Sequence, residues 1–304
     1  MVAVNERRGA VDTSCPVCGS TEFGTVDLPV RHAAGVAIHI CGECELVYLW
    51  PQPDAATLAA FYTAEYRDVY EDPTPAERHE QDLPEARLRA TRITPLVNGD
   101  ERLLEIGSGS FAFLKTIAPT VGFSLGIEPD DKTRAWFAEA SDLRTLPDIG
   151  ALTAEDGHFD LIVMFHVLEH LPDPVGYLSY LRGLLSPGGH IVVEVPNAND
   201  ALISLYNIEA FRRFYYSIAH LTYFNPTSLD HCARAAGLTG KVTGVQRYDL
   251  SNHLHWAQHG RPGGQAVYTD TISAATNNAY ARDLINAGKA DTLWGVFQVD
   301  GPAG

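Results

Sequence analysis

A strand, a glycine turn and the start of a helix follow one another within residues 102–117, and this stretch constrains the fold most. The apolar run 102–106 has the length of a strand, Gly107 and Gly109 follow it among small polar residues, and segment 111–117 has helical periodicity. Glycine permits a tight turn and lets a ligand approach without meeting a Cβ. Unpaired N–H groups at a helix N-terminus attract polar ligands. The stretch therefore predicts a nucleotide-binding site in an α/β fold.

Two classes of cofactor use such a turn, and the motif alone does not separate them. Gly107, Gly109 and Ala112 satisfy the dinucleotide pattern G-x-G-x-x-G/A, and Glu128 supplies the acid expected about 20 residues later. Glu105, at the strand end, offers a carboxylate that could receive the ammonium of a methionine moiety. This favours S-adenosylmethionine, while NAD stays open at this point.

Composition and charge exclude several classes of protein. The 304 residues are 45% hydrophobic, which suffices for one large domain with or without a small one. The net charge of -16 argues against a nucleic-acid or anionic-membrane partner. Residues 1–11 lack the apolar core of a secretory signal, and no apolar run approaches the ~20 residues of a membrane span. We therefore expect a cytoplasmic protein that binds neither membranes nor nucleic acid.

Four of the five cysteines form two C-x-x-C pairs in residues 1–52, which predicts a small zinc-binding domain there. Each turn directs two thiolates at one ion, and two such turns complete a tetrahedral site. Four protein thiolates leave no open position, so the expected role of the zinc is structural. A redox pair or a chance spacing is the alternative. The pairs are Cys15/Cys18 and Cys41/Cys44, while Cys232 lies in a helical pattern typical of a buried residue.

Residues 53–98 are expected to form a helical connecting or lid segment. Asp54 is a good N-cap for a helix over 55–66, and a second helix over 77–97 contains Pro84, which we expect to break or kink it. The aromatic side chains of this segment would either form a lid beside an active site or pack the small domain onto the large one. They are Phe61, Tyr62, Tyr66 and Tyr70.

Strand and helix patterns alternate over residues 99–304, which predicts a parallel sheet and a catalytic domain. A long segment, 247–291, interrupts the last strand pair, and such a length indicates an acceptor-binding flap or an oligomer contact, with a homodimer as one outcome. A second metal site from His253, His255 and His259 is the alternative. Strands are expected at 102–106, 122–127, 143–146, 159–165, 189–195, 241–247 and 292–299, and helices near 111–118, 130–140, 173–185 and 228–236.

Three blocks within residues 100–245 resemble class I S-adenosylmethionine-dependent methyltransferases. They are FDLIVMFHVLEHLPD at 159–173, LLSPGGHIVVEVPN at 184–197, and HLTYFNP at 220–226 followed by AGL at 236–238. The cysteine pairs ahead of them resemble the zinc-bearing arrangement of deoxysugar C-methyltransferases, which are usually longer. The resemblance implies an α/β, Rossmann-like class I methyltransferase sheet with helices on both faces, plus a small N-terminal zinc-binding domain.

The resemblance also implies which residues meet the cofactor. Glu128 would hold the ribose hydroxyls, since a carboxylate accepts two hydrogen bonds from a cis-diol. Asp148 would lie near the adenine amine and His166 under the cofactor. Phe111 stands where the family often has a third glycine, and its ring is expected either to cover the cofactor or to pack under the helix. The expected cofactor-binding residues are Glu105, Gly107, Gly109, Phe111, Glu128, Asp148 and His166.

Catalysis is expected to need orientation and a base. The sulfonium methyl is already electrophilic, so holding a small-molecule acceptor in line is the main task. A hydroxyl or an acidic carbon also needs a base, and histidine suits neutral pH. His170, with Glu169 beside it, is the expected base, His220 is a second candidate, and a structural anchor is the alternative for the Leu-Glu-His sequence. We therefore expect O- or C-methylation of a sugar or natural-product scaffold; the alternatives are an NAD-dependent oxidoreductase and a non-catalytic zinc-bearing scaffold.

Overall fold

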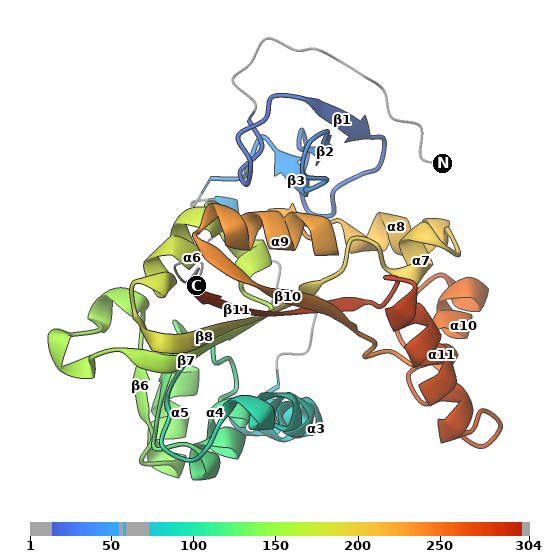
Figure 1. Ribbon diagram of the computed structural model, residues 1–304. Helices are drawn as coiled ribbons and strands as arrows, with labels where there is room; N and C mark the ends of the chain where they lie inside the picture. The colour runs from blue at the N-terminus through green and yellow to red at the C-terminus, as the bar shows by residue number, and fades with distance from the viewer. Residues whose placement is uncertain (1–13, 55–56, 59–72, 300–304) are drawn as a thin grey trace.

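The computed structural model describes residues 14–54, 57–58 and 73–299, which form two β-sheets (Figure 1). The larger sheet has the order β10-β11-β8-β7-β4-β5-β6, and the smaller has the order β1-β2-β3-β9. The strands are β1 (Phe23–Val26), β2 (Ala37–Cys41), β3 (Val47–Trp50), β4 (Arg102–Ile106), β5 (Phe123–Ile127), β6 (Arg144–Leu146), β7 (Phe159–Phe165), β8 (Leu185–Pro196), β9 (Thr222–Tyr223), β10 (Leu238–Val245) and β11 (Thr292–Val299).

The larger sheet is parallel except at one edge. Strand β4 pairs in parallel with β5 and with β7, and β6 and β8 extend the parallel part on either side. Strand β11 is antiparallel to both β8 and β10. The order of strands along the chain reverses at β4, and ligands bind in such sheets outside the carboxyl ends at this reversal. All the strands predicted from the sequence are present, although β8 begins four residues earlier than expected.

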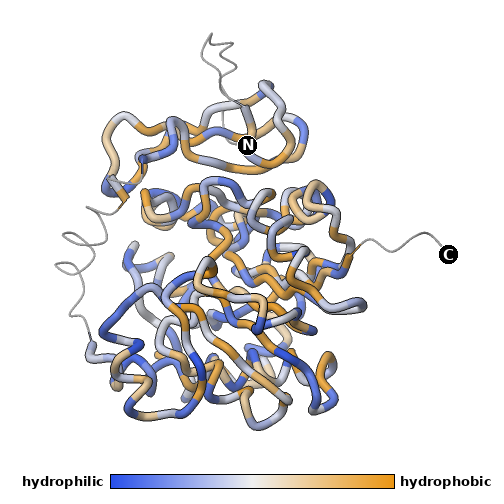
Figure 2. Tube along the Cα trace, turned by 90° about the vertical axis from the view of Figure 1, so that its left-hand side faces the viewer, coloured by the Kyte–Doolittle hydropathy of each residue, from blue (hydrophilic) through white to orange (hydrophobic). Residues whose placement is uncertain are grey.

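Helices cover both faces of this sheet, as the α/β pattern predicts. Figure 1 shows α3, α4 and α5 on one face and α6 and α9 on the other. Hydrophobic segments lie largely inside the body and hydrophilic ones along its outer helices and turns (Figure 2). Among the described helices, none has the length and apolar character needed to cross a membrane. The helices are α3 (Pro75–Ile93), α4 (Ala112–Ile117), α5 (Asp131–Ala140), α6 (Pro174–Arg182), α7 (Ala201–Ser204), α8 (Glu209–Tyr215), α9 (Pro226–Ala235), α10 (Leu250–His259) and α11 (Ala274–Asn286).

Helix α3 decides against one of the two alternatives expected for Pro84, a break. Thr74 caps the helix with its hydroxyl, and Glu77 completes a capping box. The helix continues through Pro84 to Ile93, so Pro84 does not break it, and the alternative of a kink stays a prediction. Asp54 does accept a hydrogen bond from the N–H of Thr57, but most of the helix expected over 55–66, and the aromatic residues named with it, lie outside the described residues.

The small sheet is completed by a strand that lies between β8 and β10 in the sequence. Strand β9 pairs with β3 through Val47 and Tyr223. One apolar cluster joins the two parts, because Cys44 and Tyr48 pack in the same core as Phe224. The N-terminal segment is therefore fastened to the large sheet by backbone hydrogen bonds and by a shared core.

Candidate active site

The glycine turn after β4 has a conformation and a surrounding space that suit a ligand. Gly107 and Gly109 have φ angles of 69° and 52°. A Cβ on Gly107 would lie 2.6 Å from Cγ2 of Val167, whereas a Cβ on Gly109 would meet nothing within 4 Å. Gly107 thus admits the following loop at close range, and Gly109 presents bare backbone to open space.

Phe111 packs into the core, which is the second of the two expectations for its ring. It is fully buried and stacks on Phe137 with ring centroids 4.3 Å apart. Gly126 on β5 makes this possible, since a Cβ there would lie 3.0 Å from Cε1 of Phe111. Phe111 has a φ of 58°, the left-handed region that glycine adopts most easily. A glycine would adopt that backbone angle without strain, and the angle leaves the backbone of Phe111 but not its ring near the turn.

Glu105 is a buried carboxyl group that lacks a partner on one oxygen. Its exposure is 3%, and no hydrogen-bond donor of the described residues reaches Oε2. Burial raises the pKa of Glu105 to about 8. An ammonium group placed beside it would satisfy the oxygen and stabilise the ionised form. The residue therefore fits the role expected for it at the methionine end of a cofactor.

Glu128 lies at the carboxyl end of β5, beside the glycine turn. Its Oε2 accepts a hydrogen bond of 2.7 Å from the N–H of Gly109, and Oε1 accepts one of 2.9 Å from the N–H of Asp130. Burial raises the pKa of this carboxyl above its ordinary value. Each oxygen keeps a second lone pair, so the fixed carboxylate can still accept the hydroxyls of a diol. Asp148 is exposed just past β6, the parallel neighbour of β5.

A cavity of about 450 Å³ opens at the same edge of the sheet. His166, which follows β7, and Pro196, which ends β8, line it, so it lies beside the carboxyl end of β4. Aromatic rings form much of its wall, with Trp256 packed 4.9 Å from Phe211 and 5.1 Å from Phe214 between centroids. A concave site with apolar walls and a few polar groups is the usual form of a small-molecule site.

The expected catalytic residues come together at one end of this cavity. One ligating atom from each of Glu169, His170 and His220 lies within 4.8 Å of the others. His220 lines the cavity, whereas His170 lies behind it, with the two rings 4.7 Å apart and edge to face. Nδ1 of His170 lies 2.6 Å from the carbonyl oxygen of Ala219. A carbonyl only accepts, so this nitrogen carries a hydrogen and Nε2 is the basic one.

The charges of this group follow from its burial and its contacts. Burial lowers the pKa of His220 to about 4, although the Glu169 carboxylate opposes the shift. Burial acts to raise the pKa of Glu169. Hydrogen bonding to His166 and the charges of the nearby histidines outweigh burial, so this pKa is lowered. Oε2 of Glu169 has no hydrogen-bond partner among the described residues. At neutral pH the group therefore consists of a neutral His220 near an ionised carboxylate.

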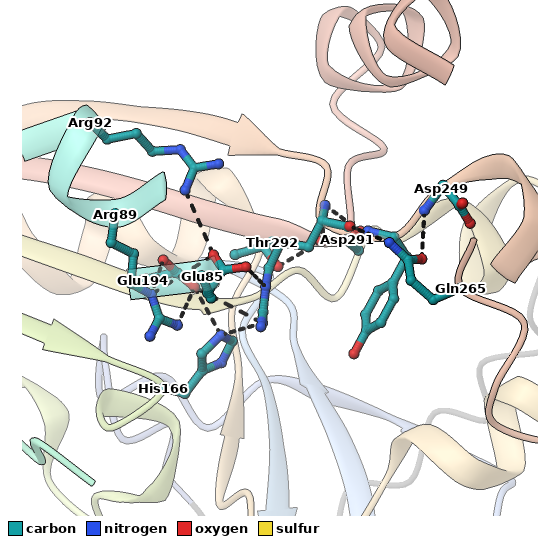
Figure 3. A network of polar contacts seen from close by, with 11 residues as sticks. Glu85, Arg89, Arg92, His166, Glu194, Asp249, Gln265, Asp291 and Thr292 are labelled. Carbon is teal, nitrogen blue, oxygen red and sulfur yellow. Dashed lines mark hydrogen bonds and ion pairs between the residues drawn. The ribbon is translucent and has the colours of Figure 1, made fainter. Parts of the chain in front are cut away.

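A buried ion network, which the sequence analysis did not find, supports His166 (Figure 3). Glu194 is fully buried on β8 and receives two hydrogen bonds from Arg89 of α3, of 3.1 and 2.8 Å. Nε2 of His166 lies 3.0 Å from Oε1 of Glu194 and 2.7 Å from Nη1 of Arg247. The sequence does contain a signal for this network, because Glu194 is an acid inside the apolar run 191–195 and buried acids are almost always paired.

His166 can hold either of two protonation states in this network. Burial acts to lower the pKa of His166, but hydrogen bonding to Glu169 and Glu194 outweighs it and raises the pKa above its ordinary value. The doubly protonated ring donates to both carboxylates, whereas the neutral ring accepts from Arg247, which always donates. The two buried carboxylates favour the protonated form, whereas the contact with Arg247 fits the neutral form, because two donors repel each other. Through Glu194 and Arg89, His166 connects the cavity wall to α3.

The long segment between β10 and β11 contributes to the cavity and does not gather its histidines around a metal site. Tyr248, Asn252 and Trp256 line the cavity from the start of this segment and from α10. Nδ1 of His253 is engaged by the Tyr280 hydroxyl at 2.6 Å. Within the described ranges, the groups suited to hold a metal are the four cysteines and the Glu169 cluster, so the alternative of a three-histidine metal site is not supported.

The four N-terminal cysteines meet at one point. Sγ of Cys15 lies 3.5 Å from that of Cys44, and Sγ of Cys18 lies 3.4 Å from that of Cys41. None of them forms a disulfide. Sulfurs placed 2.3 Å from a tetrahedral zinc are separated by roughly 3.8 Å, so the four groups fit zinc with little adjustment. Cys232 is fully buried in the core, as predicted.

Comparison with known proteins agrees with this geometry. Residues 76–241 match the model of a family described as a methyltransferase domain. A ubiquinone biosynthesis O-methyltransferase of Acinetobacter baylyi is 24% identical over 169 residues, covering 51% of this chain and 71% of the relative. One from Psychrobacter arcticus is 28% identical over 174 residues, covering 52% and 67%.

A solved structure shares the fold over most of the chain. The 1,6-didemethyltoxoflavin-N1-methyltransferase of Burkholderia thailandensis, solved with 1,6-didemethyltoxoflavin and S-adenosylhomocysteine, superposes with a TM-score of 0.52. It is 15% identical, and the match covers 90% of this chain and all of that one. Because the family model covers more than half of the sequence, the chain belongs to the methyltransferase-domain family and is an S-adenosylmethionine-dependent methyltransferase.

Proposed function

We propose that this enzyme methylates an oxygen or an acidic carbon of a small molecule, on a sugar or natural-product scaffold, with a histidine as base. The observation that carries the proposal is the cavity of about 450 Å³, which places His220 at the sheet edge where the glycine turn and Glu105 also lie. One edge thus joins a cofactor cradle, an acceptor-sized space and a base. The chain's charge of -16 makes nucleic acid and anionic membranes poor partners.

The cradle residues have separate tasks toward the cofactor. S-adenosylmethionine supplies an electrophilic methyl group when bound. Glu105 would hold its ammonium group, and Glu128 would hold its ribose hydroxyls. Gly107 and Gly109 let it approach the backbone, and Asp148 is placed to meet the adenine amine. The unpaired Oε2 of Glu105 supports this assignment best, because a buried carboxyl without a partner costs free energy until a donor reaches it.

The histidines divide the work of moving a proton. His220 faces the cavity and is neutral at neutral pH, so it can accept the acceptor's proton directly. Glu169 is ionised and close enough to stabilise the imidazolium that results. His170, anchored by the carbonyl of Ala219, positions His220 through their ring contact. The aromatic walls exclude water around the reacting groups.

The cysteine cluster is proposed to hold one structural zinc. Four thiols close the coordination shell, so no position is left for a substrate. A reducing compartment such as the cytoplasm suits the free thiols. The zinc would fix the loops that carry β1 to β3 and, through β9, the neighbourhood of His220.

Binding and transfer assays test the proposal. Calorimetry should show S-adenosylmethionine or S-adenosylhomocysteine binding at micromolar strength and NAD not binding. Radiolabelled S-adenosylmethionine with a panel of phenols, sugars and 1,3-dicarbonyl compounds should then give a labelled product. Binding of the cofactor without transfer to any hydroxyl or acidic carbon, together with transfer to amines, would replace the proposed O- or C-chemistry with N-methylation.

A further inference from the structure

The acceptor cavity contains an arginine from the N-terminal segment that lacks a counter-ion. Arg31 lines the cavity, and its guanidinium carbon lies 4.1 Å from the centre of the ring of Phe214 on α8. Its Nε is buried with no hydrogen-bond partner. Among the described residues, no carboxylate forms an ion pair with it. A buried donor without a partner costs free energy until an acceptor reaches it.

The second arginine of the cavity is in a different state. Arg247 lies 3.6 Å from a carboxylate oxygen of Glu85 and 4.0 Å from one of Glu194. These two carboxylates already compensate its charge. Arg31 is therefore the cavity arginine whose donors are available to a bound molecule.

The backbone holds Arg31 in place. Its N–H donates to the carbonyl of Tyr216, and its carbonyl accepts from the N–H of Ile218. The same short bridge leads to His220, whose pKa the Arg31 charge helps to lower. An anion on Arg31 would thus lie close to the proposed base.

The two acidic side chains that line the cavity accept hydrogen bonds from backbone N–H groups. Asp200 caps α7 through the N–H of Leu202, and Asp291 accepts from the N–H groups of Arg247 and Tyr248. Burial raises the pKa of Asp200, and the neighbouring charge of Asp291 raises it further. The two acids that line the cavity therefore have partners other than Arg31.

We propose that the acceptor carries an anionic oxygen group, a carboxylate or a phosphate, which binds to Arg31 of the N-terminal segment, while its apolar body packs against Phe214 and Trp256. This deepens the proposed function and rests on it. The N-terminal segment then supplies substrate specificity, in addition to any structural role of its cysteines. Arginine binds both kinds of anion through paired N–H groups, and a desolvated aromatic wall strengthens the interaction.

Fluorine NMR on the full chain saturated with S-adenosylhomocysteine tests this without knowledge of the natural acceptor. The probes are 4-fluorobenzoate and 4-fluorophenyl phosphate, with 4-fluorobenzamide as the neutral match. The wild-type chain should bind at least one acid roughly tenfold more tightly than the amide, and the tighter acid identifies the anion. Arg31→Gln should remove the preference, Arg31→Lys should keep part of it, and Arg234→Gln, on the outer face of α9, should leave it unchanged.

Two results would overturn the proposal. One is equal binding of acids and amide by the wild-type chain, a measurement that needs no variant to fold. The other is an acid preference that persists in Arg31→Gln. Failure of the proposed function has a different signature, since the transfer assay would then label amines and no hydroxyl or acidic carbon.

Discussion

Nδ1 of His170 lies 2.6 Å from the carbonyl oxygen of Ala219, the residue before His220. This bond gives His170 a fixed tautomer and joins the loop after β7 to the loop that carries the proposed base. The two histidines of the sequence motifs, 50 residues apart, thus belong to a single structural unit.

Removing the proposed base should separate catalysis from cofactor binding. His220→Ala should lower kcat roughly 10²–10⁴-fold and leave the Kd of S-adenosylmethionine nearly unchanged, because the imidazole acts on the acceptor's proton. His231→Ala, on the surface of α9, is the matched control. Near-normal turnover in His220→Ala would assign the proton to another group.

The pH profile should reveal the role of His170. Burial lowers the pKa of His220 to about 4, so the acid limb of kcat/KM should fall near pH 4 and not near the ordinary value of about 6.5. Since the nearby His170 helps to lower this pKa, His170→Ala should move the limb upward. An unchanged limb in that variant would reduce His170 to a structural anchor.

Cofactor affinity should depend on pH through Glu105. Its pKa is raised to about 8 by burial, so the carboxyl is mostly protonated at pH 7 and must release a proton to pair with an ammonium. Affinity for S-adenosylhomocysteine should fall by up to about tenfold per pH unit below 8. Calorimetry in buffers of different ionisation enthalpy measures the released proton, and Glu105→Gln should abolish that release and weaken binding by about 1.5–3 kcal/mol.

The same shift affects the stability of the unliganded chain. The unfolded chain ionises Glu105 near its ordinary pKa, whereas the folded chain keeps the proton up to about pH 8. The unfolded state therefore binds fewer protons between these values, and this residue makes stability fall as the pH rises through that window. Urea unfolding of wild type and Glu105→Gln at pH 5 and pH 8 should show the difference shrink in the variant.

The glycine turn should reject a single methyl group. Gly107→Ala would place a Cβ 2.6 Å from Val167 at a positive φ, so cofactor binding should be lost or fall at least tenfold. Gly157→Ala is the control, because its φ of 62° is similar and its surroundings are open. Equal effects of the two changes on binding would mean that strain, and not the close contact, is responsible.

Zinc content tests the cysteine cluster. Protein prepared without added metal should contain one zinc per chain by elemental analysis. Cys18→Ser should lose the metal and lower the apparent Tm by roughly 5–10 °C, while Cys232→Ala should keep it. Four titratable thiols with no zinc, and a Tm indifferent to chelator, would contradict the assignment.

Local patterns in the sequence predicted much of the fold and part of the site. The strands at 102–106 and 159–165 and the turn at Gly107 follow from hydrophobic runs and from glycine, which depend on neighbours along the chain. Phe111 could be placed only as an alternative, because its ring direction depends on Gly126 and Phe137. Arg89, Glu194 and Arg247 meet across three elements, and no local pattern reports such a meeting.

Arg31 shows the same limit for the acceptor cavity. In the sequence it is one of 22 lysines and arginines, and it lies between two apolar segments of the N-terminal part. Its lack of a counter-ion exists only once the chain has folded and the acids have found other partners. The proposed specificity therefore depends on which charged side chains have no counter-ion once the chain has folded.

Because β9 belongs to the small sheet, that sheet cannot be replaced freely by an unrelated module. The first residue of β9, Thr222, pairs with Tyr48 of β3, and only Leu221 separates Thr222 from His220. A replacement module from another protein would have to reproduce the edge of β3 in register before the base could return to its place. Evolution of a new acceptor preference in this enzyme is therefore expected to proceed by changes around Arg31 within the existing module, and not by recombination of whole modules.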